Sequence, residues 1–301
     1  MNAQILALAL FDGLSYAALV FMVAVGLTLI FGVLRVLNVA HGSFFAMGAY
    51  TTASVGSAIF AAGFAPWLAF PLMAISAILI GVLVGGTVEK LLLSRIYEME
   101  DVLQILVTFA VFMMLEDVQR LIWGVQPLFE TTAVNLLGTI KVFGIVYTKY
   151  QLIFLPAVAA VVLIGLRLGL RHTLTGHLIM AVTEDREAAI SIGIDAQRVY
   201  LVTFIVGASL AAFGGALASA TTSVIPGMGA DMIVLSFAVV ATAGFGQIEG
   251  AAIAAILIGL GRSFAVYFYP ELEVLMPYLI MFVVLLIKPN GLFAPVEARK
   301  I

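Results

Sequence analysis

Residues 183–194 read Thr-Glu-Asp-Arg-Glu-Ala-Ala-Ile-Ser-Ile-Gly-Ile, a short polar stretch between long apolar segments. Thr183 can serve as the N-cap of a helix, and Glu184 and Asp185 place negative charge on the first turn, where the helix dipole favours it. Gly193 can end the helix in the left-handed conformation. We expect a helix of about nine residues, about 13 Å long at 1.5 Å per residue. A capped polar helix between apolar spans is suited to docking on another protein.

The composition is that of a protein that lies in a membrane. Of the 301 residues, 63% are hydrophobic and 10% are charged, whereas a soluble domain carries about 25% charged residues. The net charge of −3 includes no basic run, so nucleic acid is not expected as a partner. The absence of cysteine excludes disulfides and thiolate metal sites. We predict an all-α, polytopic integral membrane protein in the lipid bilayer, with a single transmembrane domain over residues 1–301.

Windows of about 20 apolar residues locate the membrane-spanning helices. They fall at residues 14–34, 44–63, 67–92, 102–123, 151–170, 199–222, 232–247, 250–268 and 274–288. The segment 232–247 is short and interrupted by glycine, so eight and nine crossings are both possible. Residues 1–13 would make the first helix too long, and we expect them at the membrane interface.

Lys and Arg predict the orientation, because they gather on the cytoplasmic side of a membrane protein. If the loop 171–198 is cytoplasmic, ten of these residues lie on its side, three lie on the other side, and Arg262 lies within a span. With nine spans this places the N-terminus outside and the C-terminus in the cytoplasm. The loop 171–198 is then the cytoplasmic loop that carries the polar helix.

The longest segment on the other side is 124–150, the predicted extracytoplasmic loop. Within it, residues 140–149 are rich in residues that favour β-structure and surround Gly144. This pattern predicts a small hairpin. The hairpin either contacts an extracytoplasmic partner or covers the ends of the helices.

Two stretches interrupt the helical pattern inside the apolar region. The first is Asn38-Val39-Ala40-His41-Gly42-Ser43, and the second is Gly244-Phe245-Gly246-Gln247-Ile248-Glu249-Gly250. Transporters place substrate sites where helices are broken at membrane depth, beside a water-filled cavity. The alternative is that both are turns at the membrane surface. As pathway residues we take Asn38, His41, Gly42, Gly244, Gly246 and Gln247.

The sequence holds no catalytic or metal-binding set. No Lys follows a Gly, so the phosphate-binding loop of nucleotide hydrolases is absent, and the three histidines lack metal-ligand spacing. We therefore expect neither enzyme activity nor a cofactor nor a metal.

Two features within the spans predict how the helices pack. Small residues recur four apart in the segment 199–222, at Gly207, Ala211, Gly215 and Ser219, and they predict close approach of another helix. Arg262 should face protein or water, because a charge at the centre of a bilayer costs about 2.5–3.5 kcal/mol.

Two tracts together resemble a known family. Glu187-Ala188-Ala189-Ile190-Ser191-Ile192-Gly193 matches the Glu-Ala-Ala-x-x-x-Gly signature of bacterial ABC importer permeases. Residues 26–42, which end in Asn38-Val39-Ala40-His41-Gly42, resemble the opening of branched-chain amino-acid permeases of the Liv type. The resemblance covers nearly the whole chain. It departs from the family at 243–250, where Gln247 and Glu249 replace the usual glycine- and serine-rich sequence.

The resemblance implies a permease subunit, in the bacterial inner membrane, of an importer for branched-chain or related small hydrophobic amino acids. A second permease subunit would complete the pathway, a periplasmic binding protein would deliver the substrate, and cytoplasmic ABC ATPase subunits would hydrolyse ATP. Glu187, Ala188, Ala189 and Gly193 would form the coupling helix that the ATPase contacts. A urea or short-chain amide permease of the same family and an ion-coupled secondary transporter are the alternatives.

Overall fold

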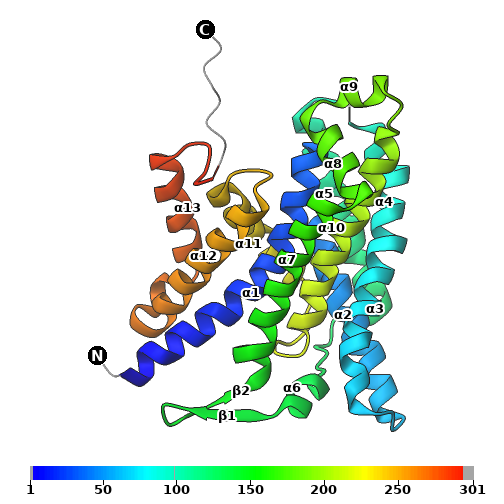
Figure 1. The fold of residues 1–301 in the computed structure, drawn as a ribbon. Coiled ribbons are helices and arrows are strands. Elements are labelled where there is room, and N and C mark those ends of the chain that lie inside the picture. The colour runs from blue at the N-terminus through cyan, green and yellow to red at the C-terminus, as the bar shows by residue number, and fades with distance from the viewer. Residues whose placement is uncertain (1–2, 98, 294–301) are drawn as a thin grey trace.

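The computed structural model describes residues 3–97 and 99–293, and its architecture is helical throughout apart from one hairpin (Figure 1). The predicted all-α class is confirmed. The helices are α1 (Ala3–Leu34), α2 (His41–Ala61), α3 (Ala69–Leu79), α4 (Gly86–Leu91), α5 (Asp101–Trp123), α6 (Thr132–Leu137), α7 (Leu155–His172), α8 (Leu174–Glu184), α9 (Arg186–Ser191), α10 (Ala196–Ala218), α11 (Met228–Ala243), α12 (Ile248–Phe268) and α13 (Met276–Ile287). A π-helical segment, Ile80–Gly85, joins α3 to α4.

Six helical segments in the described part of the chain are long and apolar enough to cross a membrane. They are Gln4–Leu34, His41–Ala61, Pro66–Arg95, Tyr150–His172, Ala196–Ala218 and Ile248–Phe268, and α11 and α13 are shorter apolar helices. The predicted polytopic membrane protein is therefore confirmed.

One sequence prediction about the spans is wrong: residues 3–13 do not lie apart from the first span. They form the first turns of α1, which has 32 residues and would be about 48 Å long at 1.5 Å per residue. The hydrocarbon layer is about 30 Å thick, and a helix that is too long for it can tilt. Figure 1 shows α1 crossing the molecule obliquely, from the N-terminus to the neighbourhood of α8.

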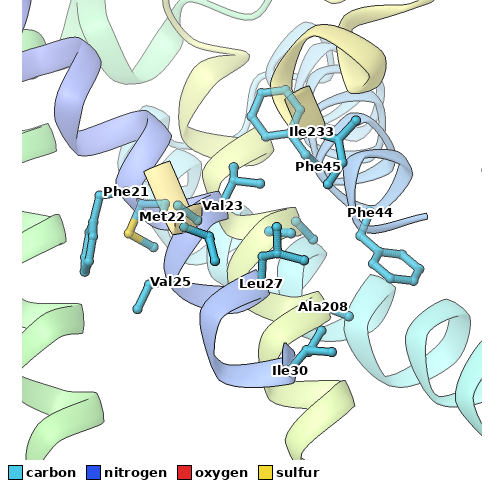
Figure 2. Close-up of a cluster of buried hydrophobic side chains, with 14 of the residues drawn as sticks. Phe21, Met22, Val23, Val25, Leu27, Ile30, Phe44, Phe45, Ala208 and Ile233 are labelled. Atoms are coloured by element: carbon cyan, nitrogen blue, oxygen red, sulfur yellow. The ribbon is translucent and has the colours of Figure 1, made fainter. Parts of the chain in front are cut away.

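Three helices, α1, α2 and α10, form the core of the bundle. Gly207, Ala211 and Gly215 of α10 and its C-cap residue, Ser219, are all buried. A Cβ atom added at Gly207 would lie 2.6 Å from Cγ1 of Ile30 in α1, and one added at Gly215 would overlap the carbonyl oxygen of Phe45 in α2. The predicted close approach along this face is confirmed, with α1 and α2 as the partners. In Figure 2, side chains of α1 (Leu27, Ile30), α2 (Phe44, Phe45), α10 (Ala208) and α11 (Ile233) meet in this core.

The predicted hairpin is confirmed. β1 (Thr139–Val142) pairs in antiparallel fashion with β2 (Ile145–Thr148). The two turn residues, Phe143 and Gly144, both have positive φ, 49° and 81°. Positive φ at both positions defines the type I′ turn that matches the twist of a two-residue hairpin. The short helix α6, which precedes the hairpin, was not predicted from the sequence.

A carboxylate in α1 ties the hairpin to the bundle. The hydroxyls of Tyr147 in β2 and Tyr267 in α12 both donate hydrogen bonds to the carboxylate of Asp12. The amide of Gln4 donates a third bond, 3.4 Å long, to the carbonyl oxygen of Phe143 in the turn. Buried Tyr147 also packs edge-on against the ring of Phe11 in α1, so Asp12 and this aromatic contact together hold the hairpin.

Asp12→Ala should loosen the hairpin while leaving the bundle folded. A hydrogen bond to a charged group contributes about 1.5–3 kcal/mol, and the variant removes the one by which Tyr147 holds the hairpin. We expect amide hydrogen exchange over residues 139–148 to become at least tenfold faster, while exchange in α10 is unchanged. Lys141→Ala is the control, because it removes a charge from the exposed surface of the same hairpin. Equal exchange in the Asp12 variant and the wild type would show that the hairpin is held in another way.

Candidate functional site

The polar stretch 183–194 folds differently at its start from the sequence prediction. Thr183 is not an N-cap, because it lies inside α8 and its hydroxyl donates to the carbonyl oxygen of Ile179, 2.8 Å away. Asp185 interrupts the helix with an extended backbone, φ −150° and ψ 101°. Its carboxylate accepts a hydrogen bond of 2.9 Å from the amide of Ala188 and caps α9. The helix α9 therefore has six residues, Arg186–Ser191, rather than about nine.

The predicted stop of this helix at Gly193 is confirmed. Gly193 has φ 91°, the left-handed conformation. Its amide donates to the carbonyl oxygen of Ile190, and the amide of Ile194 donates to that of Ala189, both at 3.0 Å. This pair of hydrogen bonds is the Schellman motif, in which glycine has the lowest cost.

The residues of α9 divide into an inner and an outer set. Ala189 is buried against the bundle, whereas Glu187 and Ala188 are exposed. Two apolar side chains also face outward: Ile190 is 49% exposed and Ile192 is 78% exposed. We call Glu187, Ala188, Ile190 and Ile192 the α9 surface. Exposed isoleucines in a short polar helix are typical of a surface that another protein covers.

A side-chain contact joins α9 to α10, and a cap fixes the start of α10 just after α9. The guanidinium of Arg186 lies 5.9 Å from the ring centroid of Tyr200, and buried Tyr200 belongs to α10. Asp195 caps α10 by accepting a hydrogen bond of 3.1 Å from the amide of Arg198. The helix α9 thus lies directly against a helix of the core.

The first break, between α1 and α2, lies inside the protein. The side chains of Asn38 and His41 are fully buried, and Nε2 of His41 is 3.0 Å from the carbonyl oxygen of Val23. Val23 precedes the end of α1 at Leu34 by about 17 Å of helix. The chain therefore folds back along α1, and α2 begins deep in the bundle. The hydroxyl of Thr108 in α5 supports the break by donating to the carbonyl oxygen of Leu37, at 3.2 Å.

Several polar atoms at this break have no partner. Within residues 3–97 and 99–293, neither polar atom of the Asn38 side chain nor Nδ1 of His41 makes a hydrogen bond. Unpaired polar atoms are costly in a protein interior, so a ligand or water would be stabilised there. Gly42 lets the start of α2 pack closely on α11, because a Cβ there would overlap the carbonyl oxygen of Gly229 in α11.

The second break, between α11 and α12, contacts a different part of α1. Gly244 and Gly246 have φ of 97° and 79°, and Gln247 occupies the N-cap position of α12. A Cβ at Gly32 would lie 3.1 Å from Cα of Gly246, so this break packs directly on α1. The first break meets α1 near Val23, about 13 Å of helix away. His41 and Gly246 therefore contact α1 at different positions along the helix.

A cleft of about 570 Å³ extends from the second break to α8. Its lining includes Gly246 and Gln247, together with Glu249 and two arginines of α7. Oε1 of Glu249 is 3.2 Å from Nε of Arg167 and 3.9 Å from a terminal nitrogen of Arg171. These groups are more than half exposed, so the ion pairs contribute little to stability. They do place opposite charges at the mouth of the cleft, beside the helix that leads into α9.

The sequence profile of a family described as the permease component of branched-chain amino acid transport systems matches residues 9–285. The chain belongs to this family. The resemblance to Liv-type permeases is thereby confirmed, and the protein is a multi-pass permease of the ABC importer class.

Individual relatives agree with the family. The permease is 24% identical over 298 residues to the high-affinity branched-chain amino acid transport system permease protein LivH of Escherichia coli strain K12. This alignment covers 97% of the permease and 96% of LivH. It is 25% identical over 303 residues to the BraD permease protein of Pseudomonas aeruginosa, with 97% of each chain covered. A solved structure, PsaBC from Streptococcus pneumoniae in complex with Fab, has a TM-score of 0.50 at 13% identity and covers 96% of the permease and 94% of that chain. That likeness concerns the fold alone.

Proposed function

We propose that this permease is the membrane subunit of an ABC importer in the bacterial inner membrane, which takes up branched-chain or related small hydrophobic amino acids by alternating access. Separate ATPase subunits bind the α9 surface on the cytoplasmic side. A second permease subunit completes the pathway, and a periplasmic binding protein delivers the substrate at the hairpin side. The printed names of the relatives, which are branched-chain amino acid permeases, support this substrate class.

The observation that carries this proposal is the exposed α9 surface on a rigid, well-stopped helix. Both ends of α9 are closed, by the cap from Asp185 and by the Schellman motif at Gly193. The short helix therefore moves as one unit when a partner pulls on it. Its contacts with α10 connect that movement to α1 and α2, which pack on α10 in the core. Packed helices of this kind switch between discrete arrangements, as alternating access requires.

The two breaks fit this mechanism as parts of the pathway. Asn38, His41 and Gly42 lie at the depth where α2 begins, and the buried, unpaired polar atoms of Asn38 and His41 would bind substrate or water in a state that opens the bundle at this break. Gly244, Gly246 and Gln247 lie beside the cleft that reaches α8. We propose that the first break contributes to the middle of the pathway and the second to its cytoplasmic mouth.

Gly193→Val tests the coupling role of α9. The left-handed conformation costs about 1–2 kcal/mol for a residue with a side chain, so valine disrupts the stop and reorients α9. The test uses the complete importer in proteoliposomes, with the binding protein present, and measures leucine uptake and ATP hydrolysis in parallel. We expect uptake per ATP hydrolysed to fall at least tenfold, with normal amounts of the protein in the membrane.

Gly63→Val is the matched control for this experiment. Gly63 has φ 84°, and at both glycines an added Cβ meets no atom within 4 Å. The control imposes the same backbone strain far from α9, and uptake per ATP should remain close to that of the wild type. Normal coupling in Gly193→Val would overturn the role of α9. Uptake by this chain alone under an ion gradient, or a binding protein that retains only amides, would overturn the proposed importer or its substrate class.

A further inference from the structure

A second cavity, of about 450 Å³, lies between α1, α11, α12 and α13, on the side of the bundle away from α9. These helices form the left part of the molecule in Figure 1. The cavity reaches inward to Phe45 near the start of α2, and it also meets Thr222 and Ser223 beyond the end of α10. Its volume falls within the range of about 300–1,000 Å³ that is typical of small-molecule sites. It is separate from the cleft beside α8.

Arg262, a charged residue within the span Ile248–Phe268, lines this cavity. Its guanidinium pairs with the carboxylate of Glu273, and its Cζ atom lies 4.2 Å from the ring centroid of Tyr16. The Arg262 and Glu273 side chains remain 30% and 36% exposed. A guanidinium has five N–H donors, so these two partners leave donors of this cavity-lining residue unused. Charged residues within membrane spans are costly and usually mark a substrate path.

An anionic group lines the same cavity from a different helix. Asp231 lies in the first turn of α11, is exposed, and has no ion-pair partner within residues 3–97 and 99–293. Between the charges, Leu19, Met232 and Leu235 supply apolar surface. The cavity thus offers a cation, an anion and an apolar wall.

We propose that this cavity binds a zwitterionic α-amino acid with an apolar side chain. The ligand carboxylate bonds to Arg262, its ammonium group bonds to Asp231, and its side chain lies against the apolar wall. This assignment rests on the proposed function and adds a site to it. A neutral urea or short-chain amide would leave Asp231 without an opposite charge, whereas the ammonium group of a zwitterion pairs with Asp231 while its carboxylate bonds to donors of Arg262 that Glu273 does not use.

The test measures uptake of radiolabelled L-leucine by the complete importer in proteoliposomes, together with the ATP hydrolysis that the loaded binding protein stimulates. Asp231→Asn removes the anion at an exposed position, so folding should be unaffected. We expect the uptake rate to fall at least tenfold, which corresponds to about 1.4 kcal/mol, while stimulated ATP hydrolysis stays within twofold. Glu271→Gln is the control, because Glu271 is an exposed carboxylate near the cavity that does not line it.

A charge exchange separates binding from stability at Arg262. The double variant Arg262→Glu, Glu273→Arg restores an ion pair between α12 and the segment before α13, yet it removes the guanidinium from the Tyr16 ring. If the original pair only stabilises the fold, the exchange restores uptake. If Arg262 holds the ligand carboxylate, uptake stays at least tenfold below that of the wild type.

The outcomes distinguish the site from the function on which it rests. A wild-type importer that takes up no leucine overturns the proposed function. A wild-type importer that takes up leucine, combined with wild-type rates in either Asp231→Asn or the charge exchange, overturns the site alone. Reduced uptake in both variants with retained ATP hydrolysis supports the site.

Discussion

Gly48→Val is expected to prevent the permease from folding. A Cβ at Gly48 in α2 would overlap the carbonyl oxygen of Ala212 in α10 and lie 2.6 Å from its Cα. These are backbone atoms of a buried helix and cannot rotate away, so α2 and α10 would have to separate. Overpacking of this kind costs about 3 kcal/mol or more, a large part of the stability of a typical protein. We expect the yield of monodisperse protein in fluorescence-detected size-exclusion chromatography to fall at least tenfold.

Gly165→Val is the matched control for this prediction. Gly165 lies in the middle of α7, and a Cβ added there meets no atom within 4 Å. Valine has a slightly better helix propensity than glycine, so the yield and the melting temperature should change little. If Gly48→Val accumulated to the level of this control, α2 and α10 could not cross as closely as the structure shows.

Local features of the fold could be predicted because they depend on only a few neighbouring residues. The hairpin needs Gly144 and the β-forming residues around it, and the stop after α9 needs Gly193. The cap of α9 was predicted wrongly because it depends on tertiary packing. Thr183 and Asp185 are both good N-cap residues, and the choice between them depends on where α8 ends. The packing of α8 on α1, α7 and α10 extends that helix to Glu184, which leaves the cap to Asp185.

Features that depend on distant contacts could not be predicted. A hydropathy window detects a span but not its tilt, so residues 3–13 were separated from α1. The break at residues 38–43 was recognised from its sequence, yet its depth follows from the contact of His41 with Val23 across 18 positions. The partner of Glu249 is similarly remote, because Arg167 belongs to α7. Nothing in the local sequence of any of these residues identifies the contacting atom.

The candidate site was therefore predicted in part. The sequence placed Glu187, Ala188, Ala189 and Gly193 on one short helix, and they do lie together at α9. It could not separate buried Ala189 from its exposed neighbours, and it missed Ile190 and Ile192 as outward-facing residues. A signal was available in the sequence, since isoleucines in a short polar helix between spans have few partners within the chain. Their exposure leads to the sharpest prediction about the ATPase.

The double variant Ile190→Asp, Ile192→Asp is expected to abolish binding of the ATPase subunits while the permease itself remains folded. Burial of an isoleucine side chain contributes about 1.5–3 kcal/mol, so the loss of two such contacts weakens binding by about 100-fold or more. Burying an unpaired carboxylate would add a further cost. The measurements are the amount of ATPase that copurifies with tagged permease and the rate of leucine uptake in proteoliposomes.

The fold should tolerate this change because both isoleucines are exposed. A size-exclusion profile of the variant that matches the wild type would confirm that it folds. Val146→Asp provides the control at the other end of the bundle, because Val146 is an exposed apolar residue of the hairpin. Its ATPase content should equal that of the wild type. If the double variant retained the ATPase at wild-type levels, the α9 surface would not be the docking site. ATPase subunits bound elsewhere could not act on α10 through the contact between Arg186 and Tyr200.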